Sequence, residues 1–263
     1  MKAALLHDYH QPLELVERPE PEPVDARGVV IRVGGAGVCA TDLHAIEGLM
    51  GGAGFDVPRV LGHENAGWVH EIGDGVTTVA PGDAVLVYPA WSCGLCVPCR
   101  RALDMHCERH QFTGLTRDGG FADYVLVDER SLVKLPDGVE PSEVAPHSDA
   151  GITAYHAVKK LVGRLDPGST TAIIGVGGVG HIALQVVRAL GAGRIVAIDT
   201  DERRRALARE LGADEVLGEQ TDIADAVREA SNGAGADVVI DFVATDATHA
   251  AGLAMTARRG LYS

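Results

Sequence analysis

The chain has 263 residues, of which 46% are apolar and 23% charged, and this ordinary balance predicts one or two globular domains with full hydrophobic cores. A formal charge of −14 argues against a general surface for nucleic acids or anionic membranes. No apolar run approaches the roughly 20 residues of a membrane span, and Asp8 follows Met1 too soon for a signal peptide. We therefore expect a cytoplasmic protein.

The first half of the chain is predicted to be rich in strands. Apolar stretches separated by turns predict strands at 14–17, 28–34, 68–72, 84–88, 120–127 and 131–135. A helix at 153–160 is expected to link this part to the rest of the chain. The domain boundary is therefore expected near residue 150.

Four of the five cysteines lie in one short segment, at Cys93, Cys96, Cys99 and Cys107. In a chain without a secretory signal, this clustering indicates a metal rather than disulfides. Four thiolates can close a tetrahedral zinc site with no open position, and such a structural site stabilises a lobe without taking part in chemistry. An iron–sulfur cluster is the alternative for this spacing.

The second half contains a predicted dinucleotide-binding turn. An apolar strand at 172–174 leads into Gly175-x-Gly177-x-x-Gly180 and then into a helix. Gly175 allows the tight turn, Gly177 leaves room for a pyrophosphate, and Gly180 lets the helix pack close to the strand. The free N–H groups at the start of the helix then face the phosphates. A glycine-rich loop in another α/β protein is the alternative.

A second strand, at 195–198, ends at Asp199, whose carboxylate is expected to bind the adenosine ribose and to repel a 2′-phosphate. NAD is therefore favoured over NADP. Further elements are predicted as a helix at 201–212, a strand at 215–217, a helix at 223–230, a strand at 237–243 and a fifth strand barely begun at 260–263.

The segment Gly62-His63-Glu64-x-x-Gly67, followed by Gly73 and Gly82-Asp83, resembles the signature of zinc-containing alcohol dehydrogenases of the medium-chain dehydrogenase/reductase superfamily. The resemblance covers essentially the whole chain and is greatest to bacterial NAD-dependent enzymes. It implies an α/β protein with a GroES-like β-rich catalytic domain at 1–150 that carries a catalytic and a structural zinc. A Rossmann domain with a doubly wound parallel sheet is implied at 151–263. We expect that sheet to be C-terminally incomplete, because the family normally has a sixth strand.

Cys39 and His63 are candidate ligands of the catalytic zinc, because such a site takes about three protein ligands and leaves one position open. A small buried thiol and a satisfied core histidine are the structural alternatives. The resemblance places a third ligand at Asp149, where the family commonly has cysteine, and His147 is the competing candidate.

The resemblance implies roles for several further residues. Glu64 corresponds to an acidic residue close to the zinc, while Thr41 and His44 follow Cys39 at the spacing of a proton relay. The expected cofactor-binding residues are Thr153, Gly175, Gly177, Gly178, Val179, Gly180, Asp199, Arg204, Phe242 and Val243. Of the run 203–205, the two arginines other than Arg204 are expected to form a solvated face.

The implied function is zinc-dependent hydride transfer between NAD and a primary or secondary alcohol, giving an aldehyde or ketone. Small apolar alcohols are favoured by candidate pocket residues Met50, Phe55, Trp91 and Leu115. One alternative is a polyol or threonine-type dehydrogenase on the same scaffold, and another is a truncated, non-catalytic zinc and nucleotide binder. The expected partners are a small alcohol or carbonyl substrate and copies of the chain in a homodimer or homotetramer, with no nucleic acid or membrane.

Overall fold

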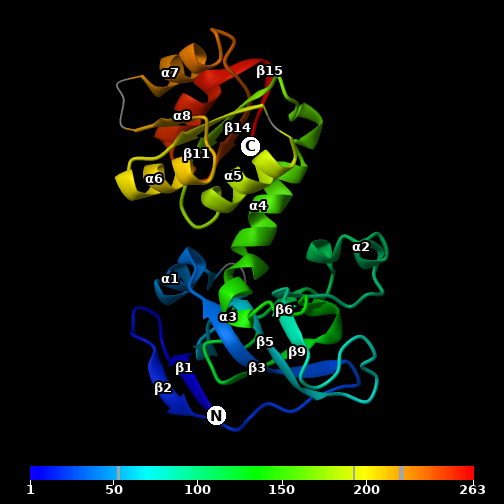
Figure 1. Cartoon of the computed structure of the whole chain (residues 1–263). Coiled ribbons are helices and arrows are strands. Elements are labelled where there is room, and N and C mark those ends of the chain that lie inside the picture. The colour runs from blue at the N-terminus through cyan, green and yellow to red at the C-terminus, as the bar shows by residue number, and fades with distance from the viewer. Residues whose placement is uncertain (52–53, 192, 219–221) are drawn as a thin grey trace. The chain divides into compact units, whose positions relative to one another are not determined.

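The computed structural model describes residues 1–51, 54–191, 193–218 and 222–263. The chain divides into two compact units, Met1–Asp149 and Ala150–Ser263 (Figure 1). Within the described ranges, no helix combines the length and the apolar character needed to cross a bilayer.

The first unit is built on antiparallel strands. Its main sheet has the strand order β10-β6-β5-β3-β9. The members are β3 (Gly28–Gly37), β5 (Glu64–Ile72), β6 (Ala84–Val87), β9 (Tyr124–Asp128) and β10 (Leu132–Lys134). Because β3 and β5 pair along almost their whole length, the register Gly37↔Glu64 brings the end of β3 beside the start of β5. The core of this sheet is rich in β-branched residues such as Val29, Ile31 and Val85.

Smaller elements complete the first unit. A second sheet has the order β2-β1-β4, and β7 pairs with β8. The strands are β1 (Lys2–Leu6), β2 (Glu14–Glu17), β4 (Arg59–Val60), β7 (Ala90–Trp91) and β8 (Gln111–Phe112). The helices and 3₁₀ turns are α1 (Ala40–Ile46), α2 (Val97–Arg100), η2 (Asp104–His106), η3 (Glu129–Ser131), α3 (Pro141–Val144) and η4 (Ala145–Ser148).

One predicted strand of this unit is shorter than expected. The stretch 120–127 becomes a regular strand only at Tyr124, where β9 begins. The backbone N–H groups of Gly120 and Phe121 bond instead to the carbonyls of Gly62 and Leu61. These residues therefore brace the loop that carries His63.

The second unit is a parallel sheet with helices on both faces, which confirms the predicted α/β fold class. All neighbouring strands in the order β13-β12-β11-β14-β15 run parallel. The strands are β11 (Thr170–Ile174), β12 (Arg194–Ile198), β13 (Glu215–Leu217), β14 (Ala236–Asp241) and β15 (Thr256–Tyr262). The helices and the 3₁₀ turn are α4 (Ala150–Lys159), η5 (Val162–Arg164), α5 (Gly180–Ala189), α6 (Glu202–Glu210), α7 (Ile223–Ala230) and α8 (Asp246–Met255).

Alternate residues of the central strands pack into two separate cores, one on each face of the sheet. Ile173 of β11 packs in the core under α4, α5 and α6, while Ala172 and Ile174 pack in the core under α7 and α8. Every residue of β11 is buried. This is the burial expected of a parallel strand covered on both faces, and it explains why the segment reads as a continuous apolar run.

The prediction of a fifth strand barely begun at 260–263 was wrong. β15 has seven residues and pairs with β14 at Leu261 and Tyr262. Helix α8, which leads into it, was not predicted. Among the residues that the structure describes, β14 is the one partner of β15, and the two central arginines of β15, Arg258 and Arg259, are exposed. Because these exposed arginines interrupt it, the strand lacks the continuous apolar run that marked β11.

Gly180→Ala should destabilise the second unit. A Cβ at Gly180 would overlap the carbonyl oxygen of Gly175, whereas a Cβ at Gly178 would meet no atom within 4 Å. Overpacking of this kind costs about 1–3 kcal/mol. Urea unfolding followed by circular dichroism should therefore show a lower midpoint for Gly180→Ala and a nearly unchanged one for Gly178→Ala. Equal midpoints for the two variants would contradict the close strand–helix contact.

Candidate functional site

Cys39, His63 and Asp149 form a cluster of potential metal ligands, with one ligand atom of each within 4.8 Å of the others. Pairing of β3 with β5 brings Cys39, just beyond β3, beside His63, just before β5. Asp149 follows η4, which packs against both strands. The Asp149 Oδ2 atom lies 3.7 Å from Cys39 Sγ and 3.5 Å from His63 Nε2. Thiolate, imidazole and carboxylate are ligands that zinc takes in sites with three protein donors.

The surroundings of His63 favour positive charge. The side chain is buried, and its Nδ1 lies 3.3 Å from Asp42 Oδ1, an ion-pair distance that falls outside hydrogen-bond geometry. Burial by itself lowers the pKa of His63, but Asp149, Asp42 and Cys39 outweigh this and raise the pKa to about 12. The carboxylates of Asp42 and Asp149 therefore favour positive charge at this imidazole. A divalent cation on the Nε2 side balances the same charges, so the donor set fits zinc.

Asp42 is a buried carboxylate that the sequence reasoning missed. Its Oδ2 accepts the backbone N–H of Cys39 at 2.9 Å, and its Oδ1 accepts the N–H of Gly62 at 3.2 Å. The same carboxylate faces His63, so one side chain holds both ligand-bearing segments. Metal-binding histidines commonly present their second ring nitrogen to such a carboxylate. One feature of the sequence could have indicated Asp42. It lies three residues after Cys39, the N-cap of α1, where an acidic residue closes a capping box.

The remaining predicted catalytic residues lie around this cluster in different ways. Thr41 Oγ1 lies 3.6 Å from Cys39 Sγ. Glu64 is buried, and its carboxylate occupies the space that a Cβ on Gly37 would need. His44 is exposed on α1. His147, the competing third ligand, is also exposed, so the structure groups Asp149 rather than His147 with Cys39 and His63.

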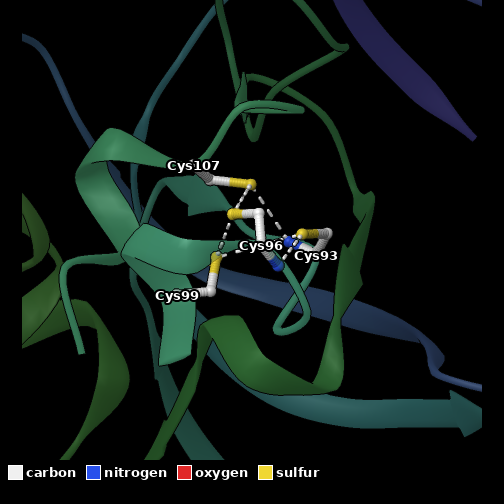
Figure 2. A group of neighbouring side chains, drawn as sticks. All are labelled: Cys93, Cys96, Cys99 and Cys107. Carbon is white, nitrogen blue, oxygen red and sulfur yellow. Dashed lines mark hydrogen bonds between the residues drawn. The ribbon is translucent and has the colours of Figure 1, made fainter. Parts of the chain in front are cut away.

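The four clustered cysteines converge as the spacing predicts (Figure 2). The Sγ atoms of Cys96 and Cys99 are 3.4 Å apart, those of Cys96 and Cys107 are 3.9 Å apart, and those of Cys93 and Cys99 are 4.0 Å apart. A zinc ion bound by four sulfurs at about 2.3 Å sets their separations near 3.8 Å. The sulfur tetrahedron therefore has the size of a closed zinc site.

Backbone N–H groups support the negative charge of this sulfur cluster. The N–H groups of Leu95 and Cys96 both donate to Cys93 Sγ at 3.4 Å and lower the pKa of this thiol to about 6. Those of Cys93 and Arg109 donate to Cys107 Sγ at 3.3 Å. Thiolate is the form that binds metal, so these bonds prepare the site for a cation.

A polar triad anchors the cysteine lobe to the main sheet. Asp104 Oδ1 accepts hydrogen bonds from Arg130 Nη2 at 2.7 Å and from Ser92 Oγ at 2.6 Å. The Arg130 guanidinium also lies 3.3 Å from the position of a Cβ on Gly94. Since Arg130 belongs to η3, between β9 and β10, the lobe is tied to the body of the first unit.

The glycine turn of the second unit has the predicted shape. Gly175 has a φ of +85°, in the left-handed region, and the start of α5 packs directly against it at Gly180. A Cβ at Gly177 would meet only Arg204 Nη1, at 4.0 Å, and a Cβ at Gly178 would meet nothing. The turn is therefore closed on its strand side and open over its two central glycines, which leaves room for a phosphate group.

Asp199 lies at the end of β12, buried beside this turn. Its Oδ2 accepts the N–H of Val176 at 2.8 Å, and its Oδ1 accepts the N–H of Asp201 at 2.9 Å. Arg204 Nη1 is 3.7 Å from the same carboxylate. The arrangement places a carboxylate and a guanidinium together beside Gly177.

The expectation that Arg205 belongs to a solvated face was wrong. Its side chain is only 17% exposed and donates to the carbonyls of Asp199 and Thr200 at 2.8 and 2.7 Å. Arg205 thus caps the end of β12 and holds the segment that presents Asp199. Arg203 is exposed, as expected.

The other predicted cofactor residues are distributed around the second unit. Val179 is the N-cap of α5. Phe242 and Val243 follow β14 and lie against the glycine turn, with Val243 Cγ2 2.7 Å from the position of a Cβ on Gly175. Thr153 lies on α4 and is exposed.

The residues expected to line a substrate pocket belong mainly to hydrophobic cores. Phe55 is buried in a cluster with Leu6, and Met50 and Leu115 pack against it. Trp91 is buried in the core of the main sheet, and the Arg117 guanidinium covers its ring at 3.8 Å. These residues therefore stabilise the unit. Phe112, which was not singled out from the sequence, has its ring centroid 6.1 Å from that of His63.

Family models match both units. Residues 25–137 match the alcohol dehydrogenase GroES-like domain, and residues 178–263 match a domain described as zinc-binding dehydrogenase. The chain is 38% identical to a D-arabinose 1-dehydrogenase (NADP(+)) of Saccharolobus solfataricus, covering 94% of this chain and 71% of the relative. It is 36% identical to an NAD-dependent alcohol dehydrogenase of Sulfolobus acidocaldarius, covering 100% of this chain and 76% of the relative.

A solved structure shows the same fold. The alcohol dehydrogenase of Aeropyrum pernix superposes with a TM-score of 0.94 at 41% identity, covering 100% of this chain and 77% of that one. The predicted GroES-like and Rossmann folds are thereby confirmed. Both family models, and relatives matched along most of their own length, agree. The chain therefore belongs to the zinc-containing alcohol dehydrogenase family of medium-chain dehydrogenases/reductases.

Proposed function

We propose that this protein is a zinc-dependent oxidoreductase that transfers a hydride between a primary or secondary alcohol and NAD, giving an aldehyde or ketone. The observation that carries the proposal is the convergence of Cys39, His63 and Asp149, with the Nε2 edge of His63 turned toward the other two donors. Four clustered cysteines form a second, closed site, so the two donor sets correspond to a catalytic and a structural zinc.

The residues of the first unit can take distinct roles in alcohol oxidation. When bound by Cys39, His63 and Asp149, zinc supplies a Lewis acid that polarises the alcohol oxygen. Asp42 fixes the orientation of His63 and the position of Cys39. Thr41, whose hydroxyl lies beside Cys39, accepts the alcohol proton as it gives up its own hydroxyl proton, which exposed His44 passes to solvent. Buried Glu64 adjusts the charge around the cluster.

The second unit supplies the cofactor site. The open backbone at Gly177 and Gly178, followed by the start of α5, suits a pyrophosphate. Asp199 and Arg204 suit an adenosine ribose, and the charge of Asp199 disfavours a 2′-phosphate. This supports NAD, which is also the cofactor named for the Sulfolobus acidocaldarius relative.

A sugar or polyol is the alternative substrate class, because a relative of 38% identity is named for its action on D-arabinose. The case for small apolar alcohols is weaker, since Phe55 and Trp91, two residues expected to line the pocket, are core residues. Cytoplasmic location and assembly into a homodimer or homotetramer stay predictions; the clustered thiols favour a reducing compartment.

Asp149→Ala should lower the rate of alcohol-dependent NAD reduction by at least about 100-fold, since loss of even an outer partner of a metal ligand costs about 10–100-fold. The measurement is absorbance at 340 nm with a panel of primary alcohols, secondary alcohols and polyols, together with zinc content by elemental analysis. His147→Ala is the matched control and should retain both the rate of NAD reduction and the zinc content of the wild type. If His147→Ala loses activity and zinc while Asp149→Ala keeps them, His147 is the ligand. A zinc-loaded wild type that is inactive with the whole panel would overturn the enzyme proposal.

Asp42→Asn should weaken zinc binding at the Cys39 site by about 10–100-fold while the four-cysteine site keeps its metal. The amide removes the negative charge opposite His63 but retains one oxygen for the backbone N–H groups. Competition with a chelator, monitored by zinc release, measures the change. Glu47→Gln, an exposed change at the C-cap of α1, should release zinc like the wild type. Equal zinc release by all three proteins would show that Asp42 does not support zinc binding.

Asp199→Asn should shift cofactor preference toward NADP by about tenfold or more in the ratio of kcat/KM values. The reason is that Asn keeps a hydrogen-bond acceptor but no longer repels a 2′-phosphate. The measurement compares NAD and NADP as varied substrates for wild type, Asp199→Asn and the exposed control Glu210→Gln. An unchanged ratio in Asp199→Asn would show that another residue sets the preference.

A further inference from the structure

The turn that follows β14 is held by one carboxylate. Asp241, the last residue of β14, accepts the backbone N–H groups of Val243 and Ala244 on Oδ1, at 2.8 and 3.0 Å. Ala244 has a φ of +56°, a left-handed conformation that is uncommon for residues other than glycine. The Asp241 carboxylate therefore stabilises a turn whose backbone is not otherwise favoured.

The second oxygen of the same carboxylate is tied to the neighbouring strand. Tyr262, at the end of β15, donates its hydroxyl to Asp241 Oδ2 at 2.9 Å. Its ring packs against α8, where a Cβ on Gly252 would overlap it, and lies edge-on to His249 at 5.1 Å between centroids. Burial and the Asp241 carboxylate raise the pKa of Tyr262 to about 12, so the phenol remains a donor throughout the physiological pH range.

The turn carries two apolar side chains to the glycine turn. The N–H of Phe242 bonds to the carbonyl of Ile174, the residue just before Gly175, at 2.9 Å. The Phe242 ring lies 3.4 Å from the position of a Cβ on Gly180, and Val243 borders Gly175. Val243 is nevertheless 48% exposed. A half-exposed valine beside an open glycine turn is an apolar wall available to a ligand in that turn.

We propose that Asp241 and Tyr262 are positioning residues for the dinucleotide, holding the 241–244 turn so that Phe242 and Val243 form a wall of the cofactor site. The inference rests on the proposed function, because it takes NAD as the ligand of the glycine turn. Asp241 acts through the turn and not by contact with the cofactor, since its two oxygens already accept three protein donors. Loss of the Tyr262 hydroxyl leaves the ring packing intact and loosens only the carboxylate.

The test measures NAD binding and stability separately in Tyr262→Phe and Asp241→Asn. Tyr262→Phe should raise the Kd for NAD, followed by intrinsic or NADH fluorescence, by about 3- to 10-fold, because one hydrogen bond to a charged group is lost. The KM for NAD should rise in parallel, while the KM for alcohol and the zinc content stay unchanged. Asp241→Asn should have a larger effect on the same quantities. Tyr9→Phe, which removes a hydroxyl bonded to Phe55 in the first unit, is the matched control and should bind NAD like the wild type.

The outcomes separate the positioning role of Asp241 and Tyr262 from the proposed function on which it rests. A wild type that binds NAD and a Tyr262→Phe variant that binds it equally well, even with a lower Tm, would overturn the positioning role and leave a structural one. A zinc-loaded wild type that does not bind NAD would overturn the proposed function itself. If Asp241→Asn does not fold, Tyr262→Phe still decides the question, because it removes a single oxygen at a partly buried position.

Discussion

The candidate catalytic centre depends on negative charge gathered around one buried imidazole. His63 lies between the carboxylates of Asp42 and Asp149, with the thiol of Cys39 beside it. Holding two carboxylates this close together around a buried side chain is unfavourable unless a cation is placed between them. Zinc on the Nε2 side of His63 would supply that cation, and the donor geometry is suited to it. The fold serves this arrangement, because β3, β5 and η4 deliver the three ligands from positions far apart in the sequence.

The second unit depends on a different constraint, the close approach of two backbone segments. Gly180 packs on the carbonyl of Gly175, and this contact starts α5 immediately beyond the end of β11. The N–H groups at the start of the helix are thereby directed over an open turn. Around it, Asp199 and Arg205 order one side, and Asp241 with Tyr262 orders the other. Polar side chains that form hydrogen bonds to the backbone thus set the shape of the site, and Arg205 and Asp241 do so without a proposed contact to the cofactor.

Short-range motifs allowed the strongest sequence predictions. The spacing of Cys93, Cys96, Cys99 and Cys107 predicted a compact sulfur cluster, and the glycine spacing predicted a turn that is tight at Gly175 and open at Gly177. Both follow from local geometry. Asp149 is different, because it meets Cys39 across 110 residues and was placed only by resemblance to a family. No periodicity in the sequence indicates such a contact.

The misses have physical causes as well. Asp42 has only the weak signal of a capping-box position, and Arg205 bonds to backbone carbonyls, which carry no residue-specific signal in the sequence. β15 contains the exposed Arg258 and Arg259 and therefore lacks the apolar run that identified β11. Phe55 and Trp91 were assigned to a pocket because apolar residues line both pockets and cores, and only the packing distinguishes the two.

The most direct test of the catalytic centre is X-ray diffraction from crystals of the protein at energies above and below the zinc absorption edge. The account predicts two zinc peaks in the anomalous difference map. One should lie within about 2.0–2.3 Å of Cys39 Sγ, His63 Nε2 and an Asp149 oxygen, and the other within about 2.3 Å of four cysteine sulfurs. A single peak, at the cysteine lobe alone, in crystals grown with excess zinc would contradict the account.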